Sequence, residues 1–197
     1  MAANRAEIGS IAIIGAGTRG RDIAQICASG GFRTILEDIL PASLRRAEGE
    51  IRKAFELAIG VGEVTRSQAE EALARIEYAS SVEQAARAAD LVIEAVPDEL
   101  ESKIEIFTLL DKVARPATIL ACSSSGFSPT DLGGVTYRAD KVLGMRFWTS
   151  AEGSELLEMV RGRRTSDETV ALCTQAARSM RVQLMVRDEV PSFEGRS

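Results

Sequence analysis

Short apolar runs alternate with longer stretches of helical periodicity along almost the whole chain. The runs predict strands at 11–14, 33–36, 91–95, 118–121, 141–147, 156–160 and 182–186. Between them, apolar residues recur every three or four positions and predict helices over 21–29, 41–59, 67–75, 99–113 and 169–180. Strands that are apolar without alternation are typical of a mostly parallel sheet with helices on both faces. We therefore expect one α/β domain over residues 1–188, with a doubly wound sheet and a helical insertion after the second strand, and a tail over 189–197.

A glycine-rich turn follows the first predicted strand and precedes the first predicted helix. Gly15, Gly17 and Gly20 match the pattern G-x-G-x-x-G within a strand–helix–strand unit, which is the context of a dinucleotide site in a Rossmann-type fold. Thr18 and Arg19 lie in the same turn, and the Arg19 guanidinium adds positive charge beside a pyrophosphate. The helix N-terminus supplies free N–H groups and the positive end of its dipole. The alternative interpretation is a turn whose glycines serve packing alone.

An acidic pair, Glu37 and Asp38, ends the second predicted strand, and Asp38 lies 18 residues after Gly20. An acidic side chain at this point accepts hydrogen bonds from the adenosine ribose and repels a 2′-phosphate. We therefore expect NAD as the cofactor in preference to NADP.

Composition narrows the classes of protein that remain. The 24 Lys and Arg residues against 29 Asp and Glu residues give a net charge of −5, which disfavours a nucleic-acid-binding role. No apolar run approaches the ~18–20 residues of a membrane span, and the start lacks the apolar stretch of a signal peptide. The three cysteines are far apart, which suits a reducing cytoplasm and predicts no metal site. Histidine is absent, so no imidazole base or ligand is available.

Three stretches, at 13–20, 89–97 and 144–147, resemble the NAD-binding domain of the 3-hydroxyacyl-CoA dehydrogenases. The similarity in order and spacing extends over about 11–188 and includes the helical insertion. The resemblance implies a cytoplasmic NAD-dependent oxidoreductase of fatty acid metabolism, with hydride transfer between the nicotinamide and an acyl-CoA-type substrate or a related hydroxy acid. It also implies cofactor contacts from Ala95, Val96, Lys103 and Ser123.

The resemblance places Arg146 where the family has the histidine that takes the substrate proton. The family's glutamate, twelve residues later, is retained as Glu158, and a serine of its substrate loop is retained as Ser125. An arginine stays protonated at neutral pH, so Arg146 cannot act as the base but can polarise a carbonyl or hold an anionic group. We expect an ion pair between Arg146 and Glu158, which is either catalytic or an idle salt bridge. The alternatives are therefore a dehydrogenase, an oxidoreductase with an anionic substrate, and a catalytically impaired NAD-binding module with a regulatory or interaction role.

The resemblance also implies a second, all-helical domain that closes the substrate cleft and makes the dimer. That domain follows a Pro-Gly-Phe element, whose counterpart here is Pro191-Ser192-Phe193, and the 197 residues contain no counterpart of the domain itself. Apolar surface that it would cover is then exposed. We expect self-association through 148–157 or through the tail around Phe193.

Overall fold

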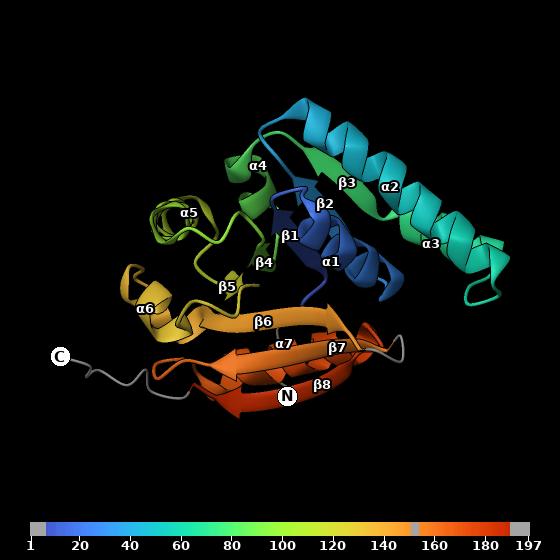
Figure 1. The fold of residues 1–197 in the computed structure, drawn as a ribbon. Coiled ribbons are helices and arrows are strands. Elements are labelled where there is room, and N and C mark those ends of the chain that lie inside the picture. The colour runs from blue at the N-terminus through green and yellow to red at the C-terminus, as the bar shows by residue number, and fades with distance from the viewer. Residues whose placement is uncertain (1–6, 151–153, 190–197) are drawn as a thin grey trace, which may run out of the picture.

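An eight-stranded sheet forms the centre of the computed structural model, which describes residues 7–150 and 154–189 (Figure 1). The strand order is β3-β2-β1-β4-β5-β6-β7-β8. Among these strands, β6 and β7 pair antiparallel and all other neighbours pair parallel, which confirms the mostly parallel sheet. The strands are β1 (Ser10–Ile14), β2 (Arg33–Glu37), β3 (Ile76–Ala79), β4 (Leu91–Glu94), β5 (Ile119–Cys122), β6 (Val142–Thr149), β7 (Glu155–Arg161) and β8 (Gln183–Asp188).

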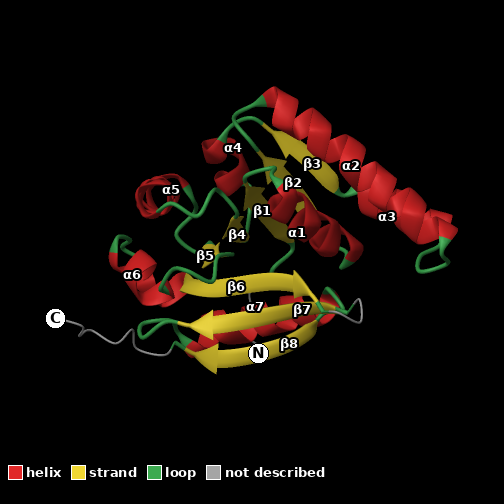
Figure 2. Ribbon diagram, viewed as in Figure 1, coloured by secondary structure: helices red, strands yellow, loops and turns green. Residues whose placement is uncertain are grey.

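Helices cover both faces of this sheet, as expected for a doubly wound fold (Figure 2). Apolar residues of α1, α2, α3 and α7 form the core on one face, and those of α4, α5 and α6 form the core on the other. The long helix α2 packs beside α3, and this pair is the predicted insertion after the second strand. The helices are α1 (Thr18–Ser29), α2 (Pro41–Gly60), α3 (Arg66–Ala74), α4 (Val82–Arg87), α5 (Leu100–Val113), α6 (Pro129–Gly134), the 3₁₀ turn η1 (Ala139–Lys141) and α7 (Asp167–Ser179).

The structure corrects the sequence prediction at its shortest elements. Strand β3 and helices α4 and α6 were not predicted, and α1 begins at Thr18 rather than at residue 21. Strand β3 has only four residues and Glu77 interrupts it, so it lacks the continuous apolar run that revealed the central strands. The insertion therefore lies between β2 and β3.

Three free cysteines lie in the cores: Cys27 in α1, Cys122 in β5 and Cys173 in α7. Burial raises the pKa of Cys122 and of Cys173 to about 12, and burial also raises the pKa of Cys27. These thiols are core residues rather than reactive groups at neutral pH.

One face of the β6–β7–β8 part of the sheet carries exposed apolar side chains. Cross-strand register places Trp148 beside Leu156, Arg146 beside Glu158, and Glu158 beside Met185. Trp148 is 41% exposed and Met185 is 56% exposed. Helix α7 packs on the opposite face of these strands.

In the described part of the chain, no helix has both the length and the apolarity to cross a bilayer.

Candidate functional site

A cavity of about 820 Å³ opens at the carboxyl ends of β1, β2 and β4. This is the edge of a doubly wound sheet where ligands bind. Its size lies within the range of small-molecule and cofactor sites, roughly 300–1,000 Å³. Seven of the predicted cofactor residues meet in its wall: Gly15, Gly17, Thr18, Arg19, Asp38, Ala95 and Val96.

Each of the three positions in the turn is occupied by glycine for a different physical reason. Gly15 has φ +106°, and a Cβ there would lie 2.9 Å from the carbonyl oxygen of Ala95. A Cβ on Gly20 would lie 1.8 Å from the carbonyl oxygen of Gly15, so α1 can approach β1 this closely only without a side chain. A Cβ on Gly17 would meet nothing within 4 Å, which leaves open space beside the cavity. Gly15 and Gly20 are thus required by packing, and Gly17 leaves room for a ligand.

The N-terminus of α1 is available to an anion. Gly17 is its N-cap and makes no side-chain capping bond, and the first turn contains no acidic residue. The first N–H groups of the helix therefore lack the side-chain acceptor that usually satisfies them. Free N–H groups and the helix dipole together fit a pyrophosphate.

The Asp38 carboxylate is fixed beside this turn by two backbone groups. Its Oδ2 accepts from the N–H of Ala16 at 3.1 Å and its Oδ1 from the N–H of Leu40 at 2.9 Å. Each oxygen retains a further lone pair for a ribose hydroxyl. The geometry agrees with the ribose-binding role predicted for Asp38.

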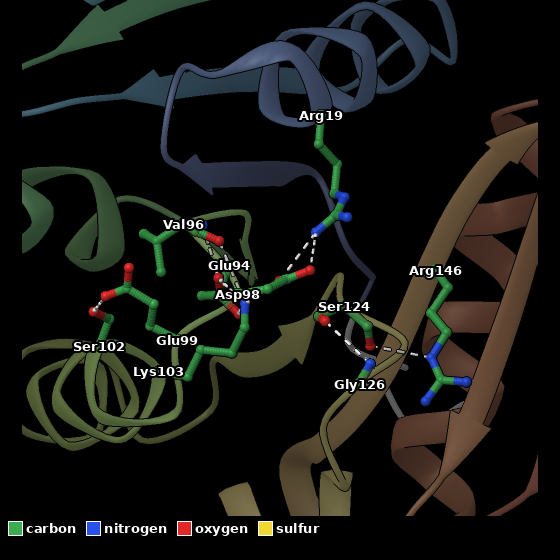
Figure 3. Close-up of polar contacts among 10 residues, drawn as sticks. All are labelled: Arg19, Glu94, Val96, Asp98, Glu99, Ser102, Lys103, Ser124, Gly126 and Arg146. Carbon is green, nitrogen blue, oxygen red and sulfur yellow. Dashed lines mark hydrogen bonds and ion pairs between the residues drawn. The ribbon is translucent and has the colours of Figure 1, made fainter.

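An ion pair spans the cavity between α1 and the loop after β4 (Figure 3). The Arg19 Nη1 lies 3.3 Å from Asp98 Oδ1, and both side chains are nearly half exposed and line the cavity. Burial raises the pKa of Asp98, but hydrogen bonds from Lys103, Arg19 and Ser124 outweigh it and hold that pKa below its ordinary value. The positive charge of Arg19 is therefore shared between Asp98 and any phosphate that binds.

Lys103 lies beneath this loop rather than in the cavity wall. Its ammonium donates to Glu94 Oε1 at 2.8 Å and Oε2 at 3.0 Å, and both side chains are fully buried. It also lies 3.2 Å from Asp98 and 5.2 Å from the ring centroid of Phe127. Lys103 thus ties α5 to the end of β4, and a direct contact with the cofactor stays a prediction.

A second cavity, of about 590 Å³, is lined by Ser125, Arg146 and Arg187, among others. Arg146 Nη1 donates to Glu158 Oε2 at 2.9 Å, which confirms the expected ion pair, and its Nε donates to the Ser124 carbonyl at 3.1 Å. Arg187 donates from its Nε to the other oxygen of Glu158, a contact that the sequence did not predict. The hydrogen bond from Arg187, and then that from Arg146, lower the pKa of Glu158 although burial opposes them.

Comparison with known proteins establishes the family of this domain. The sequence profile for "3-hydroxyacyl-CoA dehydrogenase, NAD binding domain" matches residues 10–189. The chain belongs to the 3-hydroxyacyl-CoA dehydrogenase family. NAD is the cofactor of this domain, and the cavity at the carboxyl ends of β1, β2 and β4 contains seven of the residues predicted to bind it.

Individual relatives agree with this assignment. The chain is 32% identical over 187 residues to a "Probable 3-hydroxybutyryl-CoA dehydrogenase" of Bacillus subtilis (strain 168), a match that covers 95% of the chain and 65% of the relative. It is also 32% identical over 184 residues to a "3-hydroxyadipyl-CoA dehydrogenase" of Escherichia coli (strain K12), covering 93% of the chain and 38% of the relative. The crystal structure of an (S)-3-hydroxybutyryl-CoA dehydrogenase from Ralstonia eutropha superposes with a TM-score of 0.88 at 31% identity, over 96% of this chain and 66% of that one. The chain thus spans less than two thirds of the length of these relatives.

Two serines of this dehydrogenase domain lie in the loop after β5. Ser123 is buried, and its Oγ has no hydrogen-bond partner within residues 7–150 and 154–189. Ser125 lines the second cavity with Arg146. Their roles, cofactor binding for Ser123 and catalysis for Ser125, stay predictions.

We expect Asp38→Ala to weaken NAD binding by about 5- to 150-fold. The loss of a buried ribose hydrogen bond costs about 1–3 kcal/mol. Calorimetric titration with NAD and NADP measures this, with Asp38→Asn as the matched control that keeps the acceptor oxygen. Wild-type protein that bound NADP as tightly as NAD would contradict the role of Asp38.

Proposed function

We propose that this domain takes part in hydride transfer between NAD and the 3-hydroxyl carbon of an acyl-CoA-type substrate or a related hydroxy acid. The observation that supports this most directly is that one residue, Ser124, contacts a wall residue of each cavity. The Ser124 carbonyl accepts a hydrogen bond from Arg146, which lines the second cavity. The Ser124 side chain also interacts by a hydrogen bond with Asp98, which lines the first cavity. Bound NAD supplies the hydride acceptor. A substrate in the second cavity would then have the NAD site on one side and Arg146 on the other.

In this proposal Arg146 acts as a fixed cation. Its guanidinium donates hydrogen bonds to the oxygen of the reacting carbon and stabilises negative charge there, as an oxyanion-binding group does. Glu158 holds the guanidinium in place, and Arg187 holds Glu158. Arg146 and Arg187 both pair with Glu158, and their guanidinium groups are able to bind a carboxylate or phosphate on the substrate, although Asp131 and Glu189 also line this cavity.

The second candidate function is an NAD-binding module with a regulatory or interaction role and impaired catalysis. It is favoured by the same ion pair, because neither Arg146 nor a Glu158 with a lowered pKa accepts a proton efficiently near neutral pH. Spectrophotometric assay of NADH oxidation with acetoacetyl-CoA separates the two candidates. NAD binding without any turnover of hydroxyacyl or ketoacyl substrates would favour the module.

We further propose a cytoplasmic location and a role in fatty acid metabolism. The three free, buried cysteines suit a reducing compartment, and the relatives act on acyl-CoA compounds according to their names. Fractionation of cells with an antibody against the protein tests the location.

We expect the isolated domain to self-associate through the exposed face around Trp148 and Met185. Exposed apolar patches of this kind mark interfaces, and β8 is also the last strand of the sheet. Light scattering should show oligomers that Trp148→Lys or Met185→Lys dissolves, while Leu57→Lys, at a 72% exposed position on α2, has no effect. A monomer at every concentration would contradict this expectation. The predicted contribution of Phe193 lies outside the described residues.

A further inference from the structure

Glu37, the last residue of β2, is a buried acid in the wall of the NAD cavity. It is 2% exposed, and its Oε1 makes no hydrogen bond within the described ranges 7–150 and 154–189. Its backbone neighbours in the sheet are Ile14 of β1 and Ala79 of β3, both apolar. A buried carboxyl oxygen without a partner is costly, so its presence beside a ligand cavity calls for a partner that binds there.

Among the residues that the structure describes, no cation pairs with Glu37. Asp38, the next residue, carries a negative charge of its own, and Arg19 is already paired with Asp98. Helix α4 presents Val82 to the cavity, and the charged groups near that end of α4 pair with each other. The charged groups on the cavity wall and on α4 are Arg19, Asp38, Glu83, Arg87, Asp98 and Glu105.

Protonation of Glu37 removes the free-energy cost of burying its charged carboxylate. Burial, and then repulsion from Asp38, raise the pKa of Glu37 to about 7. Near neutral pH the carboxyl therefore exists in part as an acid with one O–H donor and one carbonyl acceptor. Asp38 offers acceptors alone, so the two neighbouring acids present complementary groups at one end of the cavity.

We propose that Glu37 binds the adenosine half of NAD as an uncharged acid, donating a hydrogen bond from its carboxyl O–H, so that NAD binding above neutral pH takes up a proton. The proposal rests on the NAD site described above and adds a residue to it. Adenosine removes the remaining water from the cavity, and this disfavours a second carboxylate beside Asp38. The affinity for NAD then falls as the pH rises, because only the protonated fraction of the protein is competent to bind.

Calorimetric titration with NAD at pH 6 and pH 8 tests this directly. With a pKa of about 7 in the free protein, wild-type affinity should be about 10-fold weaker at pH 8 than at pH 6. At pH 8, titrations in two buffers of different ionisation enthalpy should show the uptake of nearly one proton per NAD bound. A wild-type protein with equal affinity at both pH values and no proton uptake would overturn the proposal.

Two variants separate the proton from the shape of the side chain. Glu37→Gln keeps the volume and an N–H donor, so it should bind NAD with an affinity that does not change between pH 6 and pH 8. Glu37→Leu removes the hydrogen-bond donor, and this variant should bind NAD weakly at both pH values. Glu70→Gln, at an exposed position on α3, is the matched control and should keep the wild-type pH dependence.

Folding and the proposed function are checked in the same samples. Both Glu37 variants should unfold at or above the wild-type temperature at pH 8, because each removes a buried unpaired acid. If Glu37→Gln kept the pH dependence, another group would titrate and the role of Glu37 would be wrong while NAD binding stood. If wild-type protein bound no NAD at either pH, the NAD site itself would be wrong.

Discussion

Replacing Lys103 by methionine should lower the free energy of unfolding by about 3–5 kcal/mol, which is a large part of the stability of a domain of this size. The ammonium of Lys103 is the cation that faces the fully buried carboxylate of Glu94, and methionine leaves that carboxylate without a counter-ion. Denaturant unfolding followed by circular dichroism measures the change.

The double variant Glu94→Gln with Lys103→Met is the control for this prediction. In the wild-type protein, Glu94 Oε1 accepts a hydrogen bond from the N–H of Val96 at 2.7 Å. Glutamine keeps an acceptor for this N–H and removes the uncompensated charge. The double variant should therefore be more stable than Lys103→Met alone. If both variants lost the same free energy, the burial of the charge would not be the cause.

The second large effect concerns turnover. With acetoacetyl-CoA and NADH, the wild-type domain should turn over at least 10²-fold below the ~10 s⁻¹ median of enzymes, because general acid–base catalysis contributes ~10²–10⁴ in rate. Arg146 remains protonated, and the hydrogen bonds from Arg187 and then Arg146 lower the pKa of Glu158. The residual rate should therefore show no titration of Glu158 between pH 6 and pH 8.

A calorimetric measurement of NADH affinity in the same buffer is the control for turnover, because a low rate with intact binding isolates the missing proton transfer. A rate constant near 10 s⁻¹ would show that Arg146 does not disable the site. It would then require another group near the second cavity to handle the proton.

The NAD turn could be predicted because its chemistry is local in the sequence. Gly15, Gly17 and Gly20 lie within six residues after a strand, and Asp38 ends the next strand. Adjacent parallel strands bring these points together at one edge of the sheet, so spacing predicted that Gly15, Gly17 and Asp38 line one cavity.

Arg187 could not be predicted in the same way, because its contact depends on pairing across the sheet. It lies 29 residues from Glu158, and α7 separates the two strands in the chain. The parallel register of β7 and β8 pairs Arg187 with Val160, two residues from Glu158 on the same face, and its side chain reaches Glu158 from there. An arginine near the end of the chain has no local signal that indicates such a partner.

Lys103 and Glu37 show a second limit of sequence patterns. A lysine in an amphipathic helix usually lies in solvent, yet Lys103 is fully buried because Glu94 at the end of β4 needs a counter-ion. Glu37 and Asp38 were treated as one acidic pair, although Glu37 is the last residue of β2 and is buried, whereas Asp38 follows the strand and is partly exposed. Burial of a charged group depends on three-dimensional contacts that periodicity does not describe.

The cysteines lie in the two core layers on opposite faces of the sheet, so their reactivity reports on each layer separately. Cys27 and Cys173 belong to the core under α1 and α7, whereas Cys122 belongs to the core under α4 and α5 on the other face of the sheet. Because the thiolate is the reactive form, each buried thiol reacts with an alkylating reagent only when its own layer opens. The site at which the label appears first therefore identifies the layer that loosens first, and a change at Lys103 in α5 should reveal itself at Cys122 before it reaches the other two.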